Sequence, residues 1–166
     1  RVELGNAIER AFMFDKKILF EEAIVGREIE CAVLGNEEVK ASCLGEIIPK
    51  HEFYSYDAKY VEPDGAQLIA PADVPSEIEE KIKQIAIKAF KVLECEGMAR
   101  VDFFLSKDGK IFLNEINTLP GFTKISMYPK LWSLSGIPYS KLLEELIELG
   151  FERYEKEKKL KTTAEF

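Results

Sequence analysis

The sequence is poor in the residue types that mark many metal centres and redox sites. It has one histidine, His51, which has no second candidate ligand nearby and which we read as a solvated residue. The three cysteines show neither the spacing of a zinc site nor that of a redox pair. They lie among apolar residues and are predicted to be buried free thiols of a reducing compartment: Cys31, Cys43 and Cys95.

Long apolar runs, a signal peptide, internal repeats and low-complexity segments are also missing. With 23 Lys and Arg against 30 Asp and Glu, the net charge is −7, which argues against a nucleic-acid or membrane partner. A cytoplasmic protein is the simplest expectation. The 166 residues suffice for one domain with a core. Because the chain opens at Arg1, part-way through an apparent helix, we expect it to be a piece of a larger protein.

Apolar periodicity predicts an α+β fold, an antiparallel β-sheet with helices packed on one side. Residues 1–150 are expected to form one lobe, and residues 151–166 a charged, frayed tail. The predicted helices cover residues 2–14, a stretch from Ser76 that Gly97 ends, a short stretch from Pro129, and a final stretch from about Ser140. The predicted strands cover residues 18–24, 27–34, 39–44, 67–71, 99–105 and 111–117.

The last two strands form the most informative hairpin of the sequence. Asp108–Gly109 is a strong signal for a two-residue turn. A turn of that length places Asp102 directly opposite Glu115 and Arg100 opposite Asn117, with all four on one face of the sheet.

Two interpretations of this face remain open on residue chemistry alone. Facing carboxylates repel each other, and Arg100 supplies a cation, so the group is consistent with a purely structural ion cluster. Asp102, Glu115 and Asn117 are also the oxygen ligands that Mg²⁺ prefers. The acids on the early strands are predicted to lie on a solvated face: Glu21, Glu22, Glu28 and Glu30.

Two strings carry a resemblance to a known family: Ala-Arg-Val-Asp at 99–102 and Asn-Glu-Ile-Asn-Thr-Leu-Pro-Gly at 114–121. They resemble the metal-binding end of the ATP-grasp carboxylate–amine ligases, in particular the D-alanine–D-alanine ligases. The resemblance reaches to about Gly150 and implies the C-terminal ATP-grasp lobe, with ATP and Mg²⁺ as cofactors (two ions, with Mn²⁺ as an alternative). In that family ATP phosphorylates the carboxylate of one D-alanine. The amine of a second D-alanine then attacks the acylphosphate, giving the dipeptide of peptidoglycan precursors.

The resemblance also implies roles for single residues. Asp102, Glu115 and Asn117 match the metal ligands. Arg100 and the Gly121 amide match the groups that stabilise the oxyanion of the tetrahedral intermediate. Nucleotide contacts are implied at Glu21, Ala23 and Ile24 for the adenine, at Glu28 for the ribose hydroxyls, and at Asn114.

Two further segments match substrate-binding parts of the family. The stretch 53–60 resembles the loop that closes over the active site. Within it Lys59 matches a lysine that contacts the transferred phosphate, and Tyr60 a tyrosine near the second amino acid. Ser126 and the backbone of Met127 match the groups that bind the second substrate's carboxylate.

The resemblance leaves other classes open. A different ATP-grasp ligase and a non-catalytic nucleotide-binding module are the alternatives. The N-terminal and central lobes of the family lie outside this sequence, so the chain alone is expected to be inactive. The oligomeric state, with a homodimer as one option, and the choice of D-alanine over D-lactate or D-serine as acceptor are also open.

Overall fold

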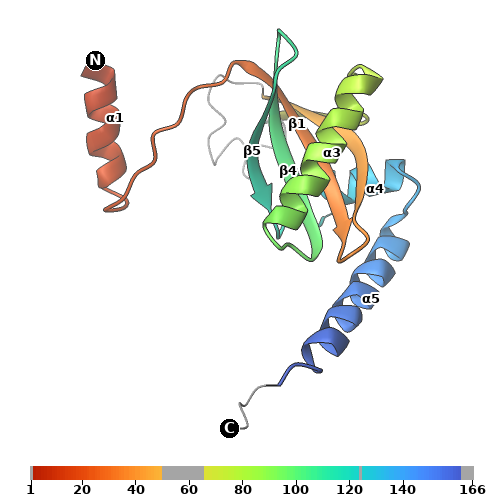
Figure 1. The fold of residues 1–166 in the computed structure, drawn as a ribbon. Coiled ribbons are helices and arrows are strands. Elements are labelled where there is room, and N and C mark those ends of the chain that lie inside the picture. Colours follow the sequence, from red (N-terminus) through yellow and green to blue (C-terminus); the bar gives the residue numbers. More distant parts are fainter. Residues whose placement is uncertain (1, 50–65, 124, 162–166) are drawn as a thin grey trace.

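The computed structural model describes residues 2–49, 66–123 and 125–161, and its centre is one five-stranded antiparallel sheet (Figure 1). The strand order is β3-β2-β1-β4-β5, so the two strands predicted to pair as the central hairpin lie at one edge. The strands are β1 (Gly26–Gly35), β2 (Lys40–Pro49), β3 (Ala66–Ile69), β4 (Gly97–Ser106) and β5 (Ile111–Asn117). The helices are α1 (Val2–Phe12), α3 (Ser76–Val92), α4 (Met127–Leu134) and α5 (Tyr139–Glu157).

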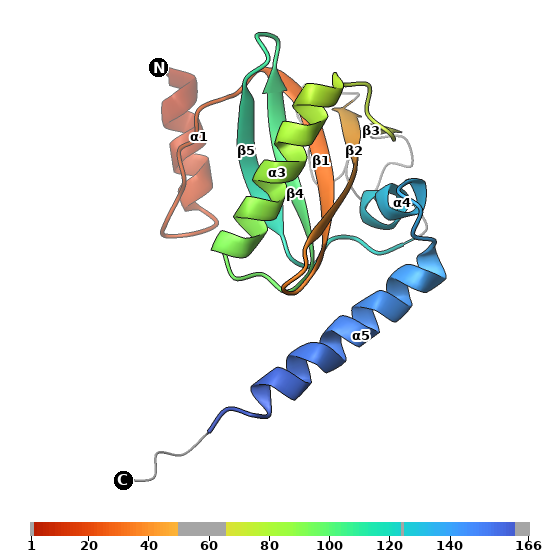
Figure 2. The same cartoon turned by 45° about the vertical axis from the view of Figure 1, so that its right-hand side comes forward.

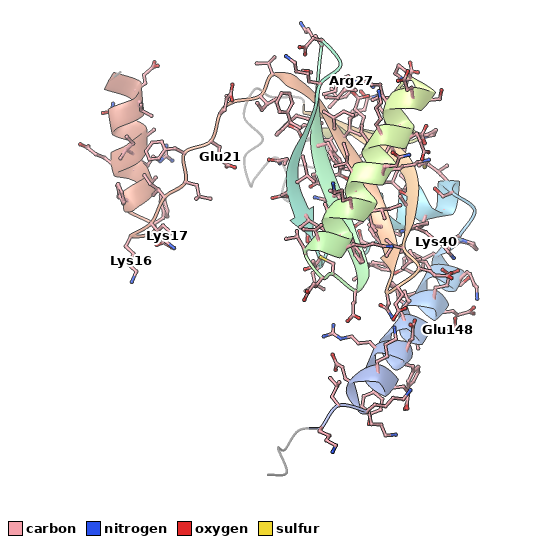
Figure 3. All side chains as sticks on the ribbon, in the orientation of Figure 1. Lys16, Lys17, Glu21, Arg27, Lys40 and Glu148 are labelled. Carbon is pink, nitrogen blue, oxygen red and sulfur yellow. The ribbon has the colours of Figure 1, made fainter. Side chains whose placement is uncertain are left out.

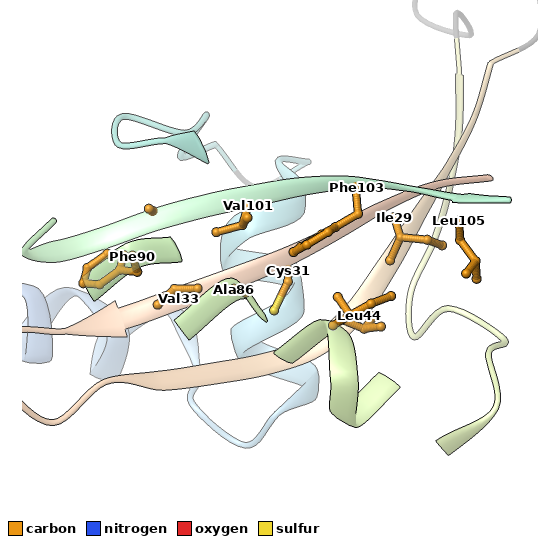
Figure 4. Packing of buried hydrophobic residues seen from close by; sticks show 11 residues of the cluster. Ile29, Cys31, Val33, Leu44, Ala86, Phe90, Val101, Phe103 and Leu105 are labelled. Atoms are coloured by element: carbon orange, nitrogen blue, oxygen red, sulfur yellow. The ribbon is translucent and has the colours of Figure 1, made fainter. Parts of the chain in front are cut away.

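The main core lies between the sheet and α3. Alternate residues of β1 and β4 point to this side, because successive side chains of a strand face opposite ways. Ile29 and Val101 are fully buried there against Ile82 and Phe90 of α3. Figure 4 shows this layer, in which the strand side chains pack against the helix. The α+β class with an antiparallel sheet is therefore as the sequence predicted.

Helices also cover the other face, which differs from the prediction of helices on one side. Ala32 and Leu34 of β1 are buried against Tyr128 and Trp132 of α4 and Leu142 of α5. The reason is visible in β1, whose residues from Ile29 to Gly35 are all buried. A strand buried on both faces needs a cover on both faces.

The last helix leads away from the sheet (Figure 2). It continues past Gly150 to Glu157, so the start of the segment predicted to be a frayed tail is helical. In the part of the chain that the structure describes, no helix combines the length and apolar character needed to cross a membrane.

The segment between α1 and β1 corrects one predicted element. Residues 18–24 were expected to form a strand, but they form neither helix nor strand. An extended segment becomes a strand only beside a partner, and β1 already pairs with β2 on one side and β4 on the other. Figure 3 shows Glu21 on this segment, between α1 and the sheet.

Candidate functional site

Asp102 of β4 lies directly opposite Glu115 of β5, and Arg100 opposite Asn117, as the sequence predicted. The turn that joins the strands is nevertheless longer than predicted. The Ser106 amide donates to the Lys110 carbonyl over 3.0 Å, which leaves a three-residue loop in which Gly109 has φ +79°.

The longer loop shifts the pairing of β4 with β5 by one residue, and a β-bulge reverses this shift. From Leu105 to Phe103 the pairing is displaced by one residue, with Phe103 opposite Leu113. The register then changes between Phe103 and Asp102, so that Asn114 is an extra residue on β5. The bulge returns Glu115 to its place opposite Asp102, and it sets Asn114 at the edge of the site.

These residues line a hollow of about 140 Å³ on the face of the sheet away from α3. Its charged lining residues are Glu28, Glu30, Arg100, Asp102 and Glu115, and Asn114 lines it as well. Glu30 is paired with Asp102 across β1 and β4, as Asp102 is with Glu115 across β4 and β5. Glu30, Asp102 and Glu115 thus form a carboxylate row across three strands. Among the described lining residues, Arg100 is the only cation.

Arg100 holds two members of the carboxylate row. Its Nε and Nη2 donate to the two Asp102 carboxylate oxygens over 2.7 Å each, and its Nε lies 3.2 Å from Glu30 Oε1. Burial works against the charged form of Arg100. The hydrogen bonds to Asp102 and the charges of Glu30, Asp102 and Glu115 outweigh burial, so the pKa of Arg100 lies above its ordinary value.

The predicted metal ligands differ in how far hydrogen bonds already hold their side chains. Glu115 is exposed, whereas both Asp102 oxygens accept hydrogen bonds from Arg100. The Asn117 side-chain oxygen accepts a hydrogen bond of 3.1 Å from the Leu119 amide, which fixes the turn after β5. The described residues include no cluster of three or more His, Cys, Asp or Glu side chains arranged around a common metal position. The all-oxygen donor set nevertheless fits a hard cation such as Mg²⁺.

The predicted substrate residues meet after β5. A β-carbon placed on Gly121 would lie 3.0 Å from Ser126 Oγ, so the two positions are neighbours. Ser126 precedes α4 without capping it through its side chain, and its Oγ instead accepts a hydrogen bond of 3.0 Å from the Thr123 amide. Met127 is buried, and its side chain packs against Gly45 of β2.

Three further predicted residues, Glu21, Ala23 and Ile24, do not line the hollow. Glu21 and Ala23 are exposed and Ile24 is partly exposed, on the segment that precedes β1. Their role in adenine binding stays a prediction. Lys59 and Tyr60 lie outside the described residues, as does His51.

Glu30 is the residue of the site that sequence reasoning missed. The sequence predicts a solvated face for Glu30, but only 4% of the residue is exposed. A usable signal existed, because Glu28 and Glu30 are two residues apart on one strand and must share a face. The information that was lacking was the pairing of β1 with β4, which sets Glu30 beside Asp102 and Arg100.

Comparison with known proteins shows which family the chain belongs to. A family model described as D-ala D-ala ligase C-terminus matches residues 1–148. The D-alanine–D-alanine ligase of Shouchella clausii is 59% identical over 161 residues, which make up 97% of this chain and 44% of that protein. The chain therefore spans less than half the length of the curated relatives it matches.

Solved structures give the same family. The D-alanine–D-alanine ligase from Coxiella burnetii matches with a TM-score of 0.84 and 46% identity, over 95% of this chain and 41% of that one. The Bacillus anthracis enzyme complexed with ATP matches with a TM-score of 0.78 and 33% identity, over 95% of this chain and 50% of that one. By sequence and by fold, the chain belongs to the D-alanine–D-alanine ligase family and corresponds to the C-terminal part of its members.

Proposed function

We propose that this chain is the C-terminal, Mg–ATP-binding lobe of a cytoplasmic D-alanine–D-alanine ligase, an enzyme that joins two D-alanines at the expense of ATP. Family membership supports the ligase, and the ATP-bound B. anthracis relative supports the nucleotide. Residues 1–150 form the lobe in this proposal, and the preceding lobes of the relatives supply the rest of the active site. The dipeptide serves peptidoglycan precursor synthesis.

The observation that carries the proposal is the carboxylate row beside Arg100. Three facing carboxylates and Glu28 around one small hollow, with a single described cation, form a strongly acidic surface. Such a surface is costly unless it binds cations. Asp102, Glu115 and Asn117 are the residues that would hold Mg²⁺. Bound there, Mg²⁺ would supply positive charge that neutralises the phosphates of ATP.

The chain's own residues provide the other contacts of the proposed site. The Glu28 carboxylate accepts hydrogen bonds from the ribose hydroxyls, and Asn114 contacts the nucleotide from the bulge. Arg100 and the Gly121 amide stabilise negative charge on the oxyanion. The Ser126 hydroxyl, next to the start of α4, binds the carboxylate of the second D-alanine.

Acceptor choice belongs to the segment around residues 59–60. The match of Lys59 and Tyr60 to the ligase loop favours D-alanine over D-lactate as acceptor. An assay that offers both at neutral pH distinguishes a dipeptide-forming from a depsipeptide-forming enzyme, and preferential depsipeptide formation contradicts this assignment.

The test of the proposed function compares this chain with the full-length protein that contains it. ADP release and dipeptide formation are measured with D-alanine, ATP and Mg²⁺. The full-length protein is expected to be active and the 166-residue chain inactive. Positioning of two substrates by the other lobes is worth about 7–11 kcal/mol of the barrier, so residual activity is not expected. A full-length protein without D-alanine-dependent ADP release contradicts the proposal.

A further inference from the structure

Glu30 occupies a position with an unusual combination of charge and burial. Its side chain is 5% exposed and lies on β1 directly opposite Asp102 of β4. Arg100, two residues before Asp102 on the same face, has its Nε 3.2 Å from Glu30 Oε1. One guanidinium therefore contacts two facing carboxylates that come from neighbouring strands.

Arg100 and a metal ion compete for Asp102. In this structure the guanidinium engages both oxygens of that carboxylate, at 2.7 Å each. Mg²⁺ binds carboxylate oxygens at about 2.0–2.1 Å, and its charge repels a guanidinium on the same group. Binding of Mg²⁺ to Asp102 is therefore expected to weaken its bidentate contact with Arg100.

The displaced guanidinium needs another acceptor. The Arg100 side chain is 12% exposed, and a buried cation without a partner is strongly destabilising. The Glu30 carboxylate is already in contact, on the same face, and on the side of Asp102 opposite to Glu115.

We propose that Glu30 is a positioning residue that receives the Arg100 guanidinium when a divalent cation binds Asp102. The inference rests on the proposed function, because it needs the metal at Asp102. Glu30 keeps the Arg100 guanidinium beside the hollow and paired with a carboxylate. The divalent cation can then take the place of Arg100 at Asp102 without leaving the buried guanidinium unpaired. Arg100 is then held in one place for its contact with the reacting groups.

The test is an NMR titration of the ¹⁵N-labelled 166-residue chain with Mg²⁺ alone. In the unaltered chain, Mg²⁺ should shift the amide signals of Asp102 and Glu115. The Arg100 Nε–Hε signal should move and stay sharp, because Glu30 holds the group. In Glu30→Gln the dissociation constant should rise by about 10-fold or more, and the Arg100 signal should broaden on addition of Mg²⁺.

Two further variants separate positioning from charge and from general destabilisation. Glu30→Asp keeps the charge but withdraws the carboxylate from Arg100, so its Mg²⁺ affinity should also fall. Glu46→Gln removes another buried carboxylate, which binds Arg27 over 2.7 Å, and its Mg²⁺ affinity should match that of the unaltered chain.

Each alternative outcome is decisive. If Glu30→Gln keeps its Mg²⁺ affinity and a sharp Arg100 signal, the role of Glu30 is overturned and the metal assignment is not. Full affinity in Glu30→Asp shows that only local charge matters, and an equal loss in Glu46→Gln shows a general effect of destabilisation; either result overturns the inference. If the unaltered chain gives no response to millimolar Mg²⁺, both the metal assignment and the role of Glu30 are overturned.

Discussion

Asp102 and Glu115 face each other across the β4–β5 hairpin because a three-residue loop and a one-residue bulge shift the register in opposite directions. Two carboxylates directly opposite each other destabilise a sheet in the absence of a cation. Their position therefore supports the proposed cation site more than a role in folding.

The first prediction concerns the metal site. In the full-length protein, Glu115→Gln should abolish Mg²⁺-dependent ADP release, because one of the two proposed carboxylate ligands is lost. Without metal the same change should raise the free energy of unfolding by about 0.2–1 kcal/mol, since it removes a like-charge pair. Activity assays and urea unfolding in EDTA measure the two effects.

A matched control is Glu148→Gln, which makes the same charge change on α5 (Figure 3), at a residue that does not line the hollow. It should leave Mg²⁺-dependent activity unchanged. Near-normal turnover by Glu115→Gln would show that Glu115 is not a ligand.

The second prediction concerns Arg100. Arg100→Met leaves Asp102 and Glu30 facing each other without their shared cation, which should lower the free energy of unfolding by about 3–5 kcal/mol. In the full-length protein, the folded fraction should show a much lower kcat, with a smaller change in KM for ATP, because Arg100 is proposed to stabilise the oxyanion.

Arg100→Lys tests the geometry of the guanidinium. Lysine keeps the charge but lacks the planar fork that engages both Asp102 oxygens. It should recover part of the stability and little of the kcat. A change confined to KM in either variant would place Arg100 in ground-state binding instead.

Much of this arrangement could be predicted from the sequence, and the misses have physical causes. Apolar patterns predicted β1, β4 and β5, and the turn signal predicted that Asp102 faces Glu115. The loop length was wrong because Asp108–Gly109 is typical of two-residue turns. Here the Ser106 hydroxyl accepts a hydrogen bond from the Lys110 amide and helps to close a longer loop.

The sequence predicted neither the bulge at Asn114 nor the burial of Glu30. A bulge leaves little trace in apolar alternation, so the predicted pairing of Asp102 with Glu115 was correct although the path to it was not. Glu30 depends on contacts between strands that are far apart in the sequence. The second layer of helices has the same cause, because α4 and α5 follow the sheet and return to its other face.

The third prediction uses the burial of Cys31. Burial raises the pKa of this thiol from 9.0 to about 12. Below pH 9 both the folded and the unfolded chain keep the proton, and the thiol makes no pH-dependent contribution. Above pH 9 only the unfolded chain releases it, so the free energy of unfolding should fall by about 1.4 kcal/mol per pH unit from this group.

Urea unfolding between pH 8 and pH 10, compared with Cys31→Ala, isolates this contribution, since other titrating groups are common to both proteins. The difference in free energy of unfolding should shrink as the pH rises. Cys95→Ala is the control, because that thiol is only partly buried and its pKa is raised by burial to a lesser extent. Parallel pH profiles for the unaltered chain and Cys31→Ala would contradict the burial of Cys31.

The last prediction compares the effect on stability of alanine at two glycines, Gly109 and Gly150. A β-carbon on Gly109 or on Gly150 would meet no atom within 4 Å, so neither position is limited by space. Gly109 has φ +79° in the hairpin loop, whereas Gly150 lies inside α5. Gly109→Ala should lower the free energy of unfolding by about 1–2 kcal/mol, because alanine is strained in the left-handed region. Gly150→Ala should raise it by about 0.5–1 kcal/mol, because glycine is a poor helix former. Urea unfolding of both variants under one condition measures the difference, and changes of the same sign would mean that either the three-residue loop or the extension of α5 past Gly150 is incorrect.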